Sequence, residues 1–319
     1  MTQPVAAPEL SVVTMLYRSE PYLREFHRRV RAAAEALTPA FEIVYVDDGS
    51  PDGSAALARE LAAADSRVVV VELSRNFGHH KAMMTGLEYA RGDLVFLIDS
   101  DLEEDPALLD GFHATLHERD ADVVYGCQTR RKGGLIERTT GDFAFWVFEL
   151  LLSYPIPRNH MTVRLMRRAY VNALLQHRER EVVIGGLWAI TGFRQVGVAI
   201  AKGHRRNSTY SYWQRWKLFL DSVTSFSAAP LVAIFYLGLA ISSLSAMVAG
   251  WVLVNKLLRG GIVDGWVSVM LSVWFLGGLL VFCVGVIGIY ISTIFNETKN
   301  RPYTIVRRVH AAQESDRIS

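Results

Sequence analysis

The sequence has little cysteine and little net charge, and each shortage argues against a class of protein. Its 319 residues include two cysteines, Cys127 and Cys283, which are far apart and form no CxxC pair. This spacing indicates neither a disulfide nor a cysteine-ligated metal. Lys and Arg number 34 and Asp and Glu number 32, a formal net charge of +2. A nucleic-acid-binding protein typically has a basic surplus, so we expect no nucleic-acid partner.

Charged side chains are absent from two long stretches, residues 222–255 and 265–296. Each exceeds the roughly 20 residues that span a bilayer, so we predict two transmembrane helices, at about 230–254 and 266–289. The loop between them is short, which makes the pair a hairpin.

The distribution of Lys and Arg predicts the orientation of this hairpin. Basic residues cluster before and after it, whereas the loop between the helices holds Lys256 and Arg259. By the positive-inside rule both termini are cytoplasmic. The first residues lack the apolar core of a signal peptide, so the N-terminal domain is expected to stay in the cytoplasm. We therefore predict a multi-pass protein of the inner, cytoplasmic membrane.

Four regions follow from this division. We expect a cytoplasmic domain at 1–203, an aromatic interfacial segment at 204–224, the two membrane helices within 225–297, and a cytoplasmic tail at 298–319. Tyr and Trp mixed with Arg and Lys are typical of a helix lying on the bilayer surface.

The N-terminal domain alternates short β-branched runs with helical patterns. The strands are predicted at 11–15, 42–46, 67–73, 94–98 and 122–125, and the helices at 21–37, 54–64, 81–90 and 106–119. This alternation predicts an α/β fold with a mostly parallel sheet and helices on both faces. Ligands bind such sheets outside the carboxyl ends of the strands.

Two of these strand ends are acidic. Asp99 and Asp101 follow the fourth strand and can point the same way in extended backbone. Such carboxylates suit Mg²⁺ or Mn²⁺ together with substrate phosphate oxygens. Asp47 and Asp48 follow the second strand and either belong to the same site or form an Asp-rich turn that starts the next helix.

Four segments carry a family resemblance: VDDGSPDG at 46–53, SRNFGH at 74–79, DSDL at 99–102, and SFS with PL at 225–231. Together they resemble the family 2 glycosyltransferases of GT-A fold. More narrowly, the chain is similar to the polyprenyl-phosphate glycosyltransferases, relatives of dolichol-phosphate mannose synthase with a two-helix membrane anchor. The resemblance extends from about residue 10 to residue 309.

The resemblance implies a donor site and a metal. Binding of the nucleotide sugar is implied for Tyr17, Val46, Asp48, Asp99, Ser100 and Asp101. Asp99 and Asp101 would be the catalytic pair and would hold Mg²⁺ or Mn²⁺, with Glu103 as a further ligand where the family often has Gln. Residues 159–162 lack two acids of the family pattern, so no general base is carried over to this segment.

A lipid phosphate acceptor needs no such base, because it is already largely ionised at neutral pH. Its head group requires cations, and the candidates are Arg164, Lys202, Arg205 and Arg206. The last three alternatively form an ordinary basic segment that attracts anionic lipid.

We therefore expect inverting transfer of one sugar from a UDP- or GDP-linked donor to polyprenyl (undecaprenyl or dolichyl) phosphate. One alternative is a lipid-linked saccharide or other lipid hydroxyl as acceptor, with a base among Asp99, Asp101, Glu103 and His160. Another is a degenerate nucleotide-sugar binder that serves as a membrane scaffold. Analogy with the family adds a flippase and a homotetramer as expected partners.

Overall fold

A computed structural model describes residues 7–128, 160–177, 184–200, 265–299 and 301–311, with scattered positions between 231 and 258. The chain divides into two compact units. The first contains the N-terminal residues, residues 154–211 and the residues from 301 onward, and the second contains residues 212–300 with 140–153.

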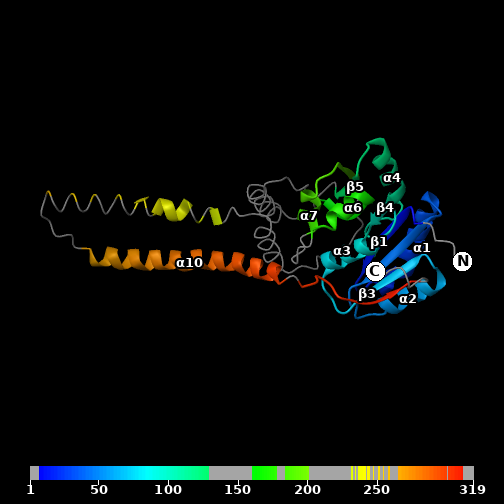
Figure 1. Cartoon of the computed structure of the whole chain (residues 1–319), viewed down its shortest axis with the longest axis horizontal. Helices are drawn as coiled ribbons and strands as arrows, with labels where there is room; N and C mark the ends of the chain where they lie inside the picture. The colour runs from blue at the N-terminus through cyan, green and yellow to red at the C-terminus, as the bar shows by residue number, and fades with distance from the viewer. Residues whose placement is uncertain are drawn as a thin grey trace. The chain divides into compact units, whose positions relative to one another are not determined.

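The first unit is built on an eight-stranded sheet in the order β7-β5-β6-β4-β1-β2-β3-β8 (Figure 1). Strands β1, β2, β3 and β4 are mutually parallel, β7 is parallel to β5, β6 is antiparallel to β4 and β5, and β8 is antiparallel to β3. The strands are β1 Leu10–Leu16, β2 Phe41–Asp47, β3 Val68–Leu73, β4 Leu94–Leu97, β5 Val123–Gln128, β6 His160–Arg167, β7 Gln195–Ile200 and β8 Val306–His310.

Helices pack against both faces of this sheet. They are α1 Glu20–Leu37, α2 Ser54–Ala64, α3 His79–Tyr89, α4 Leu108–Glu118, α6 Arg168–Leu174 and α7 Ile184–Ile190. Alternate residues of a strand point to opposite faces, and every residue of β1, β2 and β3 is buried, as expected for a sheet that is covered on both faces. Val12 packs in the cluster that includes Phe26 of α1, whereas Val13 and Val46 lie under α3. A Cβ on Gly86 of α3 would lie 2.6 Å from Val13 Cγ1, so this glycine lets the helix approach the sheet closely.

The α/β fold with a mostly parallel sheet is confirmed. The five strands and four helices predicted between residues 11 and 125 are present, with ends that differ by a few residues. Strands β6, β7 and β8 were not predicted. The last of them is unexpected because it comes after the second charge-free stretch, in the region expected to be a tail.

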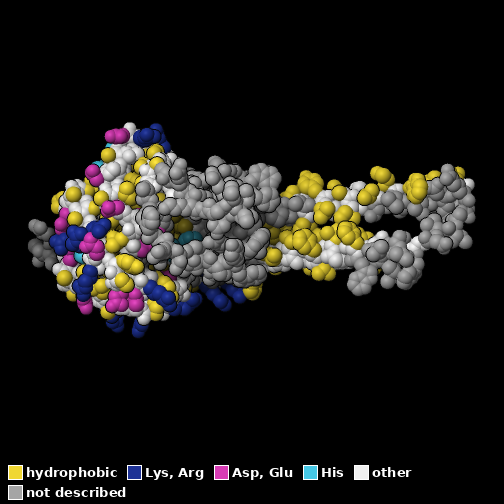
Figure 2. Space-filling view, turned by 180° about the vertical axis from the view of Figure 1, so that it is seen from behind, with side chains coloured by type: hydrophobic (Ala, Val, Ile, Leu, Met, Phe, Trp, Pro, Cys, Tyr) yellow, Lys and Arg dark blue, Asp and Glu magenta, His cyan; other side chains and the backbone are white. Residues whose placement is uncertain are grey.

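The second unit contains α10, Trp266–Thr298, which covers the second predicted membrane helix. Its segment Phe275–Phe295 has a mean hydropathy of 2.3 and is, among the described residues, the one segment long and apolar enough to span a membrane. Figure 2 shows hydrophobic side chains along this unit, and Phe275, Leu280 and Val281 are exposed. The first predicted membrane helix, at about 230–254, is described only at scattered positions, so the two-helix hairpin stays a prediction. The described positions between 231 and 258 are helical.

Candidate active site

The carboxyl ends of β1, β2 and β4 are held together by hydrogen bonds beyond the strands themselves. The N–H of Asp48, just past β2, donates to the carbonyl of Leu16 at 3.1 Å. The hydroxyl of Ser100, just past β4, donates to the carbonyl of Met15 at 3.0 Å. The acidic segments after β2 and β4 therefore meet at one edge of the sheet, on either side of the end of β1.

Asp48 binds the loop that follows β3. Its Oδ1 accepts the N–H of Phe77 at 2.7 Å and its Oδ2 accepts the N–H of Gly78 at 3.0 Å. Burial raises the pKa of Asp48, and these two amide hydrogen bonds oppose that rise by favouring the ionised form. Asp48 thus fixes residues 74–78, which we call the donor loop.

The donor loop also packs directly against the turn after β2. Gly49 has a φ of +62°, and a Cβ there would lie 2.5 Å from the carbonyl carbon of Arg75. Only glycine combines this conformation with this close approach. Within the loop the guanidinium of Arg75 lies 4.2 Å from the centroid of the Phe77 ring, so an exposed cation is stacked at the strand ends.

The segment after β4 contains the two predicted catalytic acids. Asp99 and Asp101 are both partly exposed, and Oδ1 of Asp101 accepts the N–H of Glu103 at 3.1 Å. Leu102, which follows Asp101, has a φ of +60°, a conformation that is costly for a residue with a Cβ. Such strain concentrates at functional sites.

His79 connects the donor loop to these acids. It is the first residue of α3, and its Nε2 lies 3.4 Å from Oδ1 of Asp99. The pair brings the start of the helix after β3 next to the end of β4. The described chain thus places the donor loop, His79 and Asp99 at one edge of the sheet.

Asp52 links the turns after β1 and β2. Its Oδ1 accepts the hydroxyls of Ser50 at 2.6 Å and Ser54 at 2.5 Å, and its Oδ2 accepts the N–H of Glu20 at 3.2 Å. Burial raises its pKa, but these hydrogen bonds outweigh that effect and hold the pKa of Asp52 below its ordinary value. Ser19 extends the network, because its hydroxyl lies 2.8 Å from that of Ser100.

Asp47 has the opposite electrostatic environment. Burial, reinforced by the nearby carboxylates of Glu72, Asp48 and Asp52, raises the pKa of Asp47 to about 6. The N–H of Ser50 offsets part of this rise. Because burial makes its ionised form costly, Asp47 adds negative charge to the strand ends only above its raised pKa.

Tyr17 and Val46, both predicted to contact the nucleotide, differ in exposure. Tyr17 is 47% exposed at the end of β1, where a base could stack on it. Val46 is fully buried beneath α3, and a Cβ on Gly86 would lie 2.9 Å from its Cγ2. This packing gives Val46 a structural role, and its contact with a nucleotide stays a prediction.

Arg164 of β6 was predicted to bind the acceptor phosphate, but its side chain is enclosed. It is 1% exposed, and its guanidinium lies 2.9 Å from the centroid of the Trp188 ring. Its Nε and Nη2 donate to the carbonyls of Thr162 and Met161, both at 3.2 Å. Burial lowers its pKa to about 9, so the group stays charged at neutral pH. Arg164 is buried in this structure, and its contact with a lipid phosphate stays a prediction.

The described residues contain no group of three or more His, Cys, Asp or Glu side chains arranged to hold a metal ion. Asp99 and Asp101 nonetheless form a donor set of hard oxygens at an accessible strand end. A divalent ion held through one or two carboxylates takes its other ligands from water and substrate phosphates. The residues present fit that mode, whereas a metal site formed by Asp99, Asp101 and Glu103 alone does not match the described arrangement.

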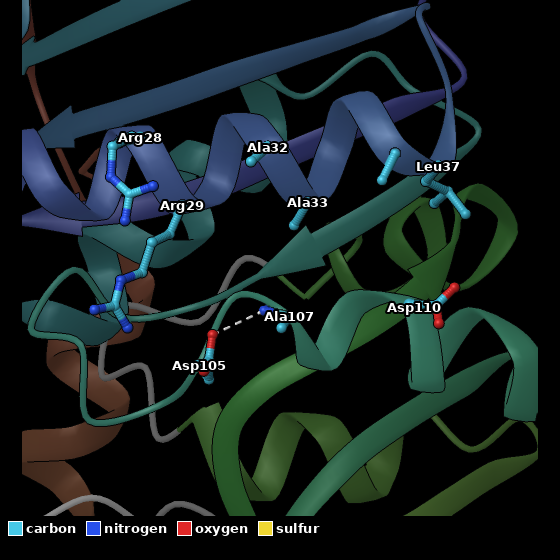
Figure 3. A pocket seen from close by; sticks show the side chains of 9 residues that line it. Arg28, Arg29, Ala32, Ala33, Leu37, Asp105, Ala107 and Asp110 are labelled. Carbon is cyan, nitrogen blue, oxygen red and sulfur yellow. Dashed lines mark hydrogen bonds between the residues drawn. The ribbon is translucent and has the colours of Figure 1, made fainter.

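Other predicted residues lie outside the described part of the chain: Lys202, Arg205 and Arg206, and the whole interfacial segment 204–224. A groove of about 470 Å³ lies between α1 and α4. Figure 3 shows side chains that line it. Its lining includes Arg29, Asp105 and Asp110 but not Asp48, Asp99 or Asp101, so it is distinct from the candidate site.

The sequence did not point to Asp52 or to the backbone amides of Phe77 and Gly78. Asp52 lies within a segment that resembled the family, but its role as a shared acceptor depends on the approach of the turn after β1. The amides carry no sequence signal, because every residue other than proline has one.

Comparison with known proteins agrees with this geometry. Residues 11–176 match the model of glycosyl transferase family 2. A Mycobacterium tuberculosis protein named as a glycosyltransferase is 51% identical over 308 residues, which cover 97% of this chain and 90% of that protein. A prophage-derived bactoprenol glucosyl transferase of Shigella flexneri is 31% identical over 309 residues, covering 95% of this chain and 98% of that protein.

Among solved structures, the mannosyltransferase PcManGT of Pyrobaculum calidifontis, in complex with GDP-Man and Mn²⁺, aligns over 92% of this chain and 87% of its own. Its sequence identity is 18% and the TM-score is 0.48. The family assignment depends instead on the family model and on the two sequence relatives. On that basis the chain is a glycosyltransferase and belongs to glycosyl transferase family 2.

Proposed function

We propose that this glycosyltransferase moves a single sugar, with inversion, from a UDP- or GDP-linked donor to a polyprenyl phosphate at the cytoplasmic face of a membrane. Two findings support the acceptor class. The similarity to a bactoprenol glucosyl transferase spans nearly the whole of both chains. The apolar helix α10, whose segment Phe275–Phe295 is almost entirely unburied, also supports a protein that works at a bilayer.

The observation that carries the proposal is the meeting of the acidic segments and the donor loop at one edge of the sheet. Asp99 and Asp101 lie at the end of β4, and His79 joins Asp99 to the start of α3. Arg75 and the exposed ring of Tyr17 flank this edge. A nucleoside diphosphate requires both a stacking surface and groups that offset negative charge, and these residues offer both.

Mg²⁺ or Mn²⁺ held by Asp99 and Asp101 together with the donor diphosphate would neutralise charge on the departing nucleoside diphosphate. The residues of the chain orient the donor around that position. Asp48 keeps the donor loop in place, and Ser100 fixes the end of β4 to β1 so that the two acids hold their positions.

The acceptor supplies its own nucleophile. The second pKa of a phosphate monoester is about 6, so a lipid monophosphate is largely a dianion at neutral pH. One of its oxygens attacks the anomeric carbon, a new C–O bond forms, and the bond to the donor diphosphate breaks with the electron pair leaving on the nucleoside diphosphate. No proton has to be removed from the acceptor, so the absence of the family acids from residues 159–162 is compatible with activity.

Membrane placement completes the proposal. Two membrane helices, both termini in the cytoplasm and an inner-membrane location follow from the charge distribution. Lys202, Arg205 and Arg206 are proposed to bind the acceptor head group, because they immediately precede the aromatic interfacial segment. A flippase and a second copy of the chain stay predicted partners.

The test is a transfer assay with the full chain in membranes or nanodiscs. Labelled UDP- and GDP-sugars are offered with three acceptors: undecaprenyl phosphate, the matching polyprenyl alcohol and soluble saccharides. We expect label in the organic-extractable product with the phosphate acceptor, and less than about one hundredth of that with the alcohol, whose hydroxyl needs a base. Transfer to the alcohol or to a saccharide, with none to the phosphate, would contradict the proposed acceptor. Binding of a donor without any transfer would instead indicate the scaffold alternative.

A further inference from the structure

The residues that follow α10 return to the first unit and bind on both sides of the donor loop. We call residues 303–310 the C-terminal strap. It ends in β8, which lies along the outer edge of β3, and Figure 1 shows this red segment running beside β3. The match to the family model ends at residue 176, so the strap lies outside the matched part of the chain.

The strap secures β3 up to its carboxyl end. Val70 pairs with His310 and Val71 with Val309, and the register shifts between Glu72 and Leu73. Such a bulge changes the direction of a strand locally and is common next to active sites. The side chain of Glu72 also contacts the strap, because its Oε1 lies 3.2 Å from Nε2 of His310.

The strap next binds the first residue of the donor loop. The N–H of Ser74 donates to the carbonyl of Ile305 at 2.9 Å. Ser74 directly follows β3 and is itself exposed, so this backbone bond holds the point where the loop leaves the sheet. Beyond it, Asp48 binds the amides of Phe77 and Gly78.

The strap also binds the helix that follows the loop. The hydroxyls of Thr304 and Thr85 lie 2.8 Å apart. Thr85 is 1% exposed, and its hydroxyl donates its one hydrogen to the carbonyl of Lys81 at 3.1 Å. The hydroxyl of Thr304 is therefore the donor in the bond between the two threonines. The hydroxyl of Tyr303 donates to Oε2 of Glu88, one turn further along α3, at 3.1 Å.

From these contacts we propose that the C-terminal strap positions the donor loop, and that Thr304 is a positioning residue for nucleotide binding. The strap fixes Ser74, the first residue of the loop, and Thr85 in the helix after it, while Asp48 holds the last two loop residues, Phe77 and Gly78. His79, which contacts Asp99, is the first residue of the same helix that Thr304 binds. This inference rests on the proposed function, in which the loop contacts a nucleoside diphosphate.

The test compares Thr304→Val, which removes the hydroxyl but keeps the shape, with Thr304→Ser, which keeps the hydroxyl. Thr115→Val on α4 is the matched control, because it removes a hydroxyl that donates to the carbonyl of Gly111 far from the donor loop in sequence. Each full-length chain is examined in nanodiscs by hydrogen exchange of residues 74–78 and by titration with UDP and with GDP in the presence of Mg²⁺ or Mn²⁺. Unfolding temperatures are recorded for all variants.

We expect Thr304→Val to exchange the amides of Phe77 and Gly78 about two- to tenfold faster and to weaken nucleotide binding by a similar factor. In turnover, the KM for the donor should rise while kcat and the KM for the acceptor stay near wild type. Thr304→Ser should restore both, and Thr115→Val should change neither.

The outcomes separate this inference from the proposed function. Equal exchange and equal nucleotide affinity in wild type and Thr304→Val would overturn the positioning role while leaving the glycosyltransferase proposal intact. A wild-type chain that binds neither UDP nor GDP would overturn the proposed donor, and the positioning role with it. Slower turnover at unchanged donor KM, or weakening that Thr304→Ser does not rescue, would show that the strap acts on general stability and would also overturn the inference.

Discussion

The backbone N–H of Phe77 lies 2.7 Å from Oδ1 of Asp48, and this bond joins the loop after β3 to the turn after β2. Gly78 donates to the second oxygen of the same carboxylate. Asp48 therefore contributes to the site through the main chain of its neighbours, as well as through any direct contact with a nucleotide.

Asp48→Asn should weaken this arrangement. Asparagine offers one acceptor oxygen, and its NH₂ would face an N–H that now lacks an acceptor. We expect the unfolding free energy to fall by about 1–3 kcal/mol and the donor KM to rise. Thermal unfolding and donor titration of the variant check this, with the exposed Asp110→Asn on α4 as the matched control. Wild-type stability and donor affinity in Asp48→Asn would show that the carboxylate is dispensable.

Activity should require a divalent ion through the acids at the end of β4. Asp101→Asn removes an anionic oxygen while keeping the shape of the side chain, and we expect transfer to fall at least about a hundredfold with the fold intact. EDTA should abolish wild-type turnover, and added Mg²⁺ or Mn²⁺ should restore it. Full turnover in metal-free buffer would contradict the assignment of Asp99 and Asp101.

The raised pKa of Asp47 predicts that the folded chain is more stable at low pH than at high pH, as far as this group is concerned. Its pKa rises from 3.8 to about 6 on folding, so the folded chain binds the extra proton between about pH 4 and pH 6. Stability from this group therefore falls as the pH rises through that window, by roughly 3 kcal/mol at most. Asp47→Asn should raise the unfolding temperature at pH 8 and lose that advantage near pH 4. An equal effect at both pH values would show that charge is not the cause.

Arg164→Lys tests whether the buried cation is structural. A lysine lacks the planar group that stacks on Trp188 and cannot donate to the carbonyls of Met161 and Thr162 in the same way. We expect the unfolding free energy to fall by about 1–3 kcal/mol, while the acceptor KM stays within about twofold. A large rise in acceptor KM at unchanged stability would instead favour the predicted phosphate contact.

Membrane topology can be tested by cysteine labelling of spheroplasts from outside. In a background where Cys127 and Cys283 are replaced by serine, Gly261→Cys in the loop between the predicted helices should be labelled. Ala63→Cys, at an exposed position of α2, should be labelled only after the membrane is permeabilised. Labelling of Ala63→Cys in intact spheroplasts would reverse the predicted orientation.

The N-terminal half of the fold could be predicted because its signals are local. Strand β3, Val68–Leu73, begins with four valines, and helical patterns separate the first five strands. Strand β8 has two adjacent charged residues, Arg307 and Arg308, at its centre, so its sequence neither alternates apolar with polar residues nor forms an apolar run. It is a strand because β3 offers a free edge, which is a tertiary fact that the sequence does not show.

The candidate site was predicted in part for a similar reason. The positions of Asp48, Asp99 and Asp101 after strands followed from the order of elements, and their meeting at one edge followed from the parallel sheet. The role of Arg164 did not follow, because a cation in the middle of an apolar strand can serve a ligand or stack inside the fold. The stacking of Arg164 on Trp188 of α7 depends on the tertiary fold, and a phosphate contact of Arg164 stays a prediction.

The position of β8 in the sequence has a consequence for how the molecule is made. The edge of β3 is synthesised early, whereas the strand that covers it is synthesised after α10. A ribosome adds about 5–20 residues per second, so β3 stays uncovered for on the order of ten seconds or more while the apolar helix is made. An exposed edge of this kind is a template for pairing with other chains. Under the proposed membrane placement, mistakes in delivering α10 to the bilayer should therefore appear first as aggregation through β3, before any loss of catalytic chemistry.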